Sequence, residues 1–234
     1  MKRSAAILVA LTVVLSGIHV AIGGTPPEVT TRFFQGIPGV EIDLCIDGVE
    51  VASSVAFETT VHGPSYPADP DPPFVAHSYE IREAAVGSCT GTLLDEDFFG
   101  VVNRDKNILL AYQAGNGSPR TWAYPMAWRP RVREGRTEFS IGPFAAAPKV
   151  HVGMDGHRLL TLTADDSTYI FSQYHAGSHR FTVRDKATRE VLATETIYMP
   201  EGVTWFLMFY GDATGGYGIR AFSRIVGVRS SPSR

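Results

Sequence analysis

The chain has 234 residues and a formal net charge of −3 at pH 7, with 21 basic and 24 acidic side chains. Its hydrophobic fraction of 44% is ordinary for a globular protein and allows a sizeable buried core. A chain that binds a phosphate backbone needs a basic excess, so this balance indicates against a nucleic-acid partner. Aromatic residues make up 11%, and together with frequent Val, Ile and Thr in short runs they favour β-structure.

Residues 1–23 are predicted to be a cleaved signal peptide. Lys2 and Arg3 give a positive start, the run over 5–15 is apolar and uncharged, and small residues precede the expected cleavage point. This run is shorter than the roughly 20 apolar residues that span a bilayer, although a retained N-terminal anchor is the alternative. Cleavage removes two of the 21 basic residues and lowers the net charge from −3 to −5. We therefore expect a secreted or periplasmic protein without a stable membrane span.

A pattern of short strands occurs twice in the rest of the chain. In each copy, an alternating strand ends in Asp-Gly, the signal of a tight hairpin turn, and further strands precede and follow it. The paired segments are 32–36 with 138–142, 40–48 with 150–156, 79–83 with 181–185, and 108–112 with 206–210. The offset between the copies falls from 108 at the Asp-Gly turns to 98 at the last pair. Two copies of one fold with loops of different length produce such a decrease.

The strand pattern predicts an all-β protein. Apolar and polar residues alternate in the Asp-Gly strands, as expected where one face is buried and the other meets water. Each copy holds about seven short strands in about 100 residues, the size of an immunoglobulin-like sandwich. We predict two tandem immunoglobulin-like antiparallel β-sandwich domains over 28–128 and 137–228, a polar linker over 129–136, and a disordered tail over 229–234.

The repeated order of these motifs resembles domain-of-unknown-function family 4397. The matching segments are 42–48 and 150–156, 77–81 and 179–183, and 202–206. The resemblance covers most of residues 31–227, and it implies a secreted bacterial protein built from tandem immunoglobulin-like β-sandwiches. It implies no catalytic residues. The first copy departs from the pattern, because it carries a proline-rich insertion over 64–73.

Cys45 and Cys89 are the two cysteines of the chain, and an exported protein is expected to pair them in a disulfide. In the chain-entropy model, closing a loop of this length stabilises the fold by about 4 kcal/mol. Strand alternation directs Cys45 away from the side of Leu44, so the bridge is expected on the outer face or rim of the first copy. The second copy has Gly153 and Val191 near the equivalent positions. A redox or metal-binding pair is the alternative, without the CxxC spacing such pairs use.

Candidate metal ligands occur at His175 and His179, four residues apart. The Ala-Gly-Ser between them indicates a turn, so we interpret His179 as a strand-entry residue with His77 as its counterpart in the first copy. Acidic clusters at 95–97 and 165–166 are interpreted as solvated carboxylates, with weak calcium binding or a paired-carboxylate hydrolase as alternatives. No G-x-S-x-G nucleophile motif is present, although a triad could still assemble in space.

Two segments are candidate interaction loops. The insertion over 64–73 contains five prolines, and we expect it to be extended, with Tyr66 and Phe74 as its aromatic contacts. The glycine-rich loop over 214–218 is expected to present Tyr217. Trp122 and Trp128 are expected to pack at the junction of the copies rather than form an exposed ligand platform.

The sequence therefore predicts an exported, non-catalytic structural or binding protein of the cell envelope or extracellular space. An unknown protein or glycan is the expected partner, and no catalytic, cofactor-binding or metal-binding residues are assigned. The alternative is an exported hydrolase or metal-dependent enzyme with its site between the two repeats. A third hypothesis, surface adhesion or matrix assembly, predicts an aromatic patch near Tyr66, Phe74 or Tyr217.

Overall fold

The structure is a computed structural model that describes residues 28–67, 75–101, 106–126, 132–147, 149–164, 169–170, 173–226 and 228–229. The predicted signal peptide over 1–23 lies outside these residues. The described part of the chain consists of strands and turns and contains no helix. None of it forms a helix long and apolar enough to cross a membrane.

Eight strands form the first sandwich. Its inner sheet has the order β4-β1-β7-β8, and its outer sheet has the order β3-β2-β5-β6. The strands are β1 (Glu28–Gly36), β2 (Ile42–Ile46), β3 (Val49–Val55), β4 (Thr60–Pro67), β5 (Ala76–Glu83), β6 (Leu93–Gly100), β7 (Lys106–Gln113) and β8 (Pro119–Met126).

The second sandwich repeats this arrangement. Its inner sheet has the order β13-β10-β17-β18, with β14 also paired to β10, and its outer sheet has the order β12-β11-β15-β16. The strands are β10 (Arg136–Ala145), β11 (Val150–Met154), β12 (His157–Leu162), β13 (Tyr169–Ile170), β14 (Tyr174–His175), β15 (Gly177–Asp185), β16 (Val191–Met199), β17 (Val203–Asp212) and β18 (Gly216–Ile225).

The prediction of two tandem β-sandwiches is confirmed, and the copies share their strand register. Each inner sheet contains one parallel pair in an otherwise antiparallel sandwich. β1 runs beside β7 with Gly36 opposite Tyr112, and β10 runs beside β17 with Phe144 opposite Tyr210. Tyr112 and Tyr210 are equivalent in the repeat, so their partners Gly36 and Phe144 are equivalent as well. The expected alignment of segments 32–36 and 138–142 was wrong by two residues, a slip that keeps every side chain on its face.

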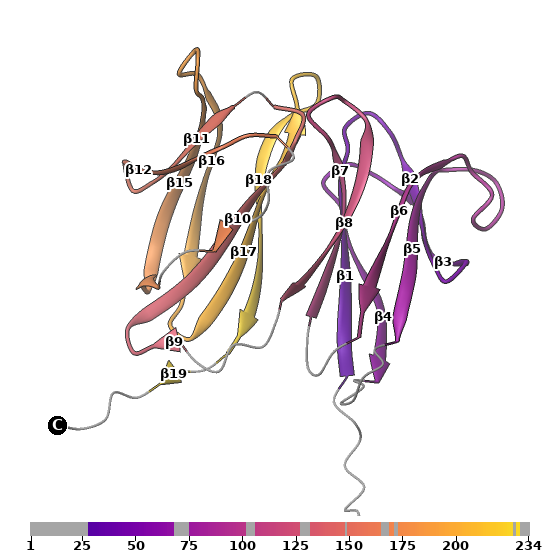
Figure 1. Cartoon of the computed structure of the whole chain (residues 1–234), viewed down its shortest axis with the longest axis horizontal. Coiled ribbons are helices and arrows are strands. Elements are labelled where there is room, and N and C mark those ends of the chain that lie inside the picture. The colour runs from indigo at the N-terminus through magenta and orange to yellow at the C-terminus, as the bar shows by residue number, and fades with distance from the viewer. Residues whose placement is uncertain are drawn as a thin grey trace, which may run out of the picture.

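The four sheets stack as layers, with the two inner sheets facing each other at the centre of the molecule (Figure 1). Each sandwich has its own core between its inner and outer sheets. A third core lies between the two inner sheets, which are therefore buried on both faces. This explains why β10 and the middle of β7 are buried almost without alternation. The third core consists of Phe34, Ile108, Leu110, Met126, Phe144, Phe206, Met208, Tyr210 and Phe222.

Aromatic side chains from both copies interlock in this third core. Trp122 of β8 stacks on Phe144 with ring centroids 4.8 Å apart, which confirms the predicted junction packing of this tryptophan. Tyr124 stacks on Phe206 at 4.0 Å. Trp128 lies outside the described residues. Such aromatic pairs add about 0.5–1.5 kcal/mol each beyond the burial of their area, so the two sandwiches are expected to behave as one rigid body.

Short strands occupy the ends of the expected domains. β9 (Val132–Arg133) lies within the segment predicted as a linker, and β10 begins at its last residue. β9 pairs in parallel with β19 (Val228–Arg229), which includes the first residue of the predicted disordered tail. The connection and the end of the second sandwich are thus held together by main-chain hydrogen bonds.

Candidate functional site

An Asp–His contact occurs at the same place in both sandwiches. Asp47 and Asp155 each begin an Asp-Gly turn with positive φ angles of 50° and 52°. Their Oδ2 atoms lie 2.6 Å from Nδ1 of His77 and 2.7 Å from Nδ1 of His179. Their Oδ1 atoms accept from the backbone N–H of the following residue, Ser78 or Arg180. Each pair ties a hairpin turn to the neighbouring strand in the same way in both copies.

His179, a candidate metal ligand, is held by Asp155 and by the main chain of His175, the other candidate. Nε2 of His179 lies 2.8 Å from the carbonyl oxygen of His175, so both ring nitrogens of His179 are engaged. Burial would lower the pKa of His179, but the Asp155 carboxylate and the His175 carbonyl outweigh it and raise the pKa above its usual value. Among the residues that the structure describes, no three His, Cys, Asp or Glu side chains gather where they could hold a metal ion.

The acidic cluster over 95–97 lies within β6. Asp95 accepts from the backbone N–H and the hydroxyl of Thr121 at 2.7 and 2.9 Å. Asp97 accepts from the backbone N–H of Ala123 at 3.3 Å. These carboxylates cap the free edge of β8 and close the side of the first sandwich. Residues 165–166, the second acidic cluster, lie outside the described part of the chain.

The predicted disulfide between Cys45 and Cys89 is confirmed. Cys45 is fully buried and does not belong to the core that contains its neighbours Leu44 and Ile46. It therefore lies on the outer face of the sheet, as expected, where the 84–91 loop covers it. Asp43 holds the start of this loop, because its Oδ2 accepts from the backbone N–H of Ala85 at 3.2 Å.

Two of the three predicted interaction residues, Tyr66 and Tyr217, lie in strands of the described structure. Tyr66 belongs to β4 and stacks against His77 with centroids 4.0 Å apart. Phe74 lies outside the described residues. Tyr217 belongs to β18, stacks on Phe209 at 5.5 Å and donates to the carbonyl of Ala146. Tyr66 and Tyr217 therefore stabilise the edges of their sandwiches.

The alternative hypothesis of an enzyme places its site between the two repeats. Its described side chains are mainly the apolar and aromatic residues of the third core. Glu58 lies at the margin of this core and accepts from the hydroxyl of Tyr210 at 2.9 Å. Burial and the neighbouring Glu58 carboxylate raise the pKa of Tyr210, so its hydroxyl remains a hydrogen-bond donor at physiological pH.

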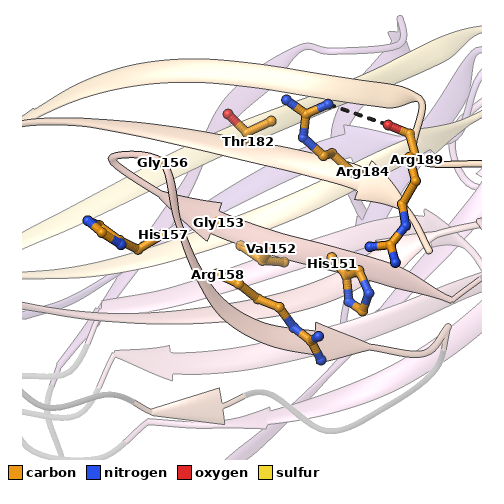
Figure 2. A pocket seen from close by; sticks show the side chains of 9 residues that line it. All are labelled: His151, Val152, Gly153, Gly156, His157, Arg158, Thr182, Arg184 and Arg189. Atoms are coloured by element: carbon orange, nitrogen blue, oxygen red, sulfur yellow. Dashed lines mark hydrogen bonds between the residues drawn. The ribbon is translucent and has the colours of Figure 1, made fainter.

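A basic pocket lies on the outer face of the second sandwich, between β11, β12 and β15 (Figure 2). Figure 2 shows the guanidinium groups of Arg158 and Arg189 on either side of the His151 ring, and Arg184 beside Thr182. The pocket has a volume of about 210 Å³. We call it the basic pocket, and its lining consists of His151, Val152, Gly153, Gly156, His157, Arg158, Thr182, Arg184 and Arg189.

The equivalent face of the first sandwich has the opposite charge. In the shared register, three carboxylates of the first copy are replaced in the second. The replacements are Asp43 by His151, Glu50 by Arg158 and Glu80 by Thr182, while Arg82 is matched by Arg184. The formal charge of these four positions changes from −2 to +2 with histidine neutral. Gly153 replaces Cys45, and the loop that covers the first face is shorter in the second copy.

The side chains of the basic pocket are held by local contacts. Thr161 links two of them, because its Oγ1 accepts from Nη2 of Arg158 at 2.7 Å and lies 2.8 Å from Nδ1 of His151. Nη1 of Arg184 donates to the carbonyl of Arg189 at 3.4 Å. Within the described ranges, none of these three arginines forms an ion pair with a carboxylate.

Burial and the positive charges of this face lower the pKa of His151. His151 is only 8% exposed. Burial, and then the nearby cations led by Arg158 and Arg189, lower its pKa. Oδ1 of the neighbouring Asp185 accepts from the backbone N–H groups of Ala187 and Thr188 at 2.6 and 2.8 Å. Among the residues that the structure describes, no carboxylate pairs with the three arginines, which leaves their guanidinium groups open to an external anion.

Sequence reasoning missed the arginines of the basic pocket, although the repeat contained a signal for them. Comparing the copies position by position shows the exchange of Glu50 for Arg158 and of Glu80 for Thr182. The overall composition gives no indication of this charge reversal, because the chain as a whole is acidic. Comparison with known proteins adds no assignment: no family profile matches the chain, and no curated protein matches it.

Proposed function

We propose that the chain is an exported, non-catalytic binding protein of the cell envelope or extracellular space. In this proposal, the first sandwich and the third core form a rigid support, and the outer face of the second sandwich carries the contact surface. The disulfide supports an oxidising compartment, since paired cysteines persist there. The resemblance to family 4397 leads to the same proposal of a secreted bacterial protein.

The observation that carries the proposal is the difference between the two outer faces. The first is closed by a disulfide-linked loop, and its Arg82 is neutralised by Glu80, whose Oε2 lies 2.7 Å from Nε and 2.6 Å from Nη2. The second is open and presents arginines that lack such partners within the described residues. Two copies of one fold that diverge in this way support a scaffold role for the first and a binding role for the second.

The structural role of the Asp–His pairs also supports a non-catalytic protein. A general base needs a ring nitrogen within reach of a substrate. In His179, both ring nitrogens face protein oxygens, so neither is free to reach a substrate. The pattern that first suggested chemistry is therefore used to hold two hairpins in place.

Two measurements test the proposal. Mass spectrometry of the protein from the periplasmic and extracellular fractions is expected to find a chain that begins after residue 23 and has an oxidised Cys45–Cys89 bridge. Immobilised mature protein is then expected to retain an envelope component that rebinds after purification. An unprocessed chain in the cytoplasm, or a mature chain that retains nothing, contradicts the proposal.

A further inference from the structure

We infer that the basic pocket binds a phosphate or sulfate group. This inference rests on the proposed binding function and names the chemistry of its ligand. The pocket combines three exposed guanidinium groups, a sheltered imidazole and a hydroxyl on one face of an otherwise acidic chain. Its volume of about 210 Å³ exceeds the roughly 30 Å³ that one water molecule occupies in the liquid, so a tetrahedral oxyanion with part of its parent molecule fits.

The first sandwich shows how this face holds an anion. There, two nitrogens of Arg82 bind the Glu80 carboxylate, an anion supplied by the chain itself. In the second sandwich, Arg184 keeps the position of Arg82, but Thr182 replaces the glutamate. The guanidinium remains and the internal anion is lost. An external oxyanion can take the place of that carboxylate, with the Thr182 hydroxyl as an additional donor.

The other end of the pocket carries more positive charge than a single carboxylate would neutralise. Arg158 and Arg189 flank His151 (Figure 2), and Lys149 and Lys186 are close enough to lower the pKa of its imidazole. Guanidinium groups match the oxygens of phosphate and sulfate with paired hydrogen bonds. Several cations around one site favour an anion with three or more acceptor oxygens over a carboxylate with two.

The pocket is organised before a ligand arrives. Thr161 orients the Arg158 guanidinium, and the Arg184 guanidinium is bonded to the main chain of the 186–190 turn that carries Arg189. Gly153 contributes no side chain to the lining, and an added Cβ would lie only 3.1 Å from the carbonyl oxygen of His157. Less side-chain ordering is then required on binding, which favours affinity.

Calorimetric titration of the mature, oxidised protein tests this inference. The probes are inorganic phosphate, inorganic sulfate and acetate at constant ionic strength, together with glycerol phosphate and glucosamine 6-sulfate to tell which ester is preferred. Saturable binding of phosphate or sulfate is expected, at least tenfold tighter than that of acetate. The absence of saturable binding by every oxyanion, or equal affinity for acetate, overturns the inference.

Two variants locate the binding. The double substitution Arg158→Gln and Arg189→Gln is expected to weaken binding at least tenfold, whereas Arg120→Gln, an exposed arginine of the first sandwich, leaves it unchanged. Thr182→Glu restores the carboxylate of the first copy beside Arg184 and is also expected to weaken binding at least tenfold. Thermal melting verifies that each variant is folded. Unchanged affinity in both pocket variants places the anion elsewhere and overturns the inference.

The two proposals fail in different ways. If the oxyanions do not bind while the mature protein still retains its envelope component, the anion site is wrong and the binding function stands. If phosphate binds in the pocket but the chain is not exported and retains no envelope component, the proposed function is wrong and the site stands.

Discussion

Oδ2 of Asp155 lies 2.7 Å from Nδ1 of His179, and the same contact joins Asp47 to His77 at 2.6 Å in the first sandwich. In each case, an Asp-Gly hairpin turn is attached to the next strand of its outer sheet. The equivalence of these pairs shows that the repeat extends from strand order to individual side-chain contacts.

The Asp155–His179 pair is expected to make stability depend on pH. The pKa of His179 is raised, so its contribution is present below the unfolded pKa of about 6.5 and is lost as pH rises through the folded pKa. The pKa of Asp155 is lowered, because hydrogen bonds from His179 and Arg180 outweigh burial, so its contribution is lost as pH falls through that pKa. Asp155→Asn keeps an Asx-Gly turn and removes the charge. Because solvent screens this pair, we expect a loss of about 1 kcal/mol in urea unfolding at pH 5.

The sign of this pH effect is the critical part. At pH 8, the variant and the unmodified chain are expected to differ by less than they do at pH 5, because the contribution of His179 falls as pH rises through its raised pKa. A difference that is larger at pH 8 contradicts the assigned roles of the two groups.

Asp95 closes the side of the first sandwich, so Asp95→Ala is expected to lower the free energy of unfolding by about 1.5–3 kcal/mol, the range for hydrogen bonds to a charged group. The substitution leaves the N–H of Thr121 without its acceptor. Glu96→Ala, an exposed neighbour on the same strand, is the matched control and is expected to change stability by less than about 0.5 kcal/mol. Equal losses in the two variants would show that the capping contact is unimportant.

Phe206 joins the two sandwiches, so Phe206→Ala is expected to cost about 3–5 kcal/mol. The ring is fully buried and stacks on Tyr124 of the other sandwich. The unmodified protein is expected to unfold in one cooperative transition, and the variant in two, when urea unfolding is followed by tryptophan fluorescence and circular dichroism. The control is Tyr198→Ala, because Tyr198 is 68% exposed. Two separate transitions in the unmodified protein would contradict a shared core.

Removing the disulfide is expected to lower the free energy of unfolding by about 4 kcal/mol in the chain-entropy model. The double substitution Cys45→Ser and Cys89→Ser tests this by urea unfolding under identical conditions. Non-reducing mass spectrometry of the unmodified chain provides the control, and free thiols at both positions contradict the bridge.

Much of the fold could be predicted because its signals are local. The Asp-Gly turns and alternating strands indicated the hairpins, and their recurrence indicated two sandwiches. The stacking of the two inner sheets depends on residues from both copies, so it cannot be predicted from any one segment of the sequence. The apolar runs over 108–111 and 206–210 were its one signal, because a strand without alternation is buried on both faces.

The basic pocket was harder to predict, because its side chains come from strands and a turn that only pairing brings together. His151 and Arg158 flank one hairpin, whereas Arg189 follows β15. Tyr217 was predicted to be exposed because glycines surround it, yet the opposite strand offers Phe209 as a packing surface. Whether such a side chain is exposed or packed depends on its neighbours on the adjacent strand, and these cannot be identified from sequence spacing.

The difference between the two outer faces is tested most directly by one titration of the isotopically labelled mature protein with phosphate, followed by amide NMR. We expect saturable shifts confined to residues 150–158, 182–184 and 188–190 around the basic pocket, with the equivalent residues 42–50 and 80–82 unchanged. Shifts of similar size on both outer faces, or none near Arg158 and Arg184, would contradict the assignment of binding to the second sandwich.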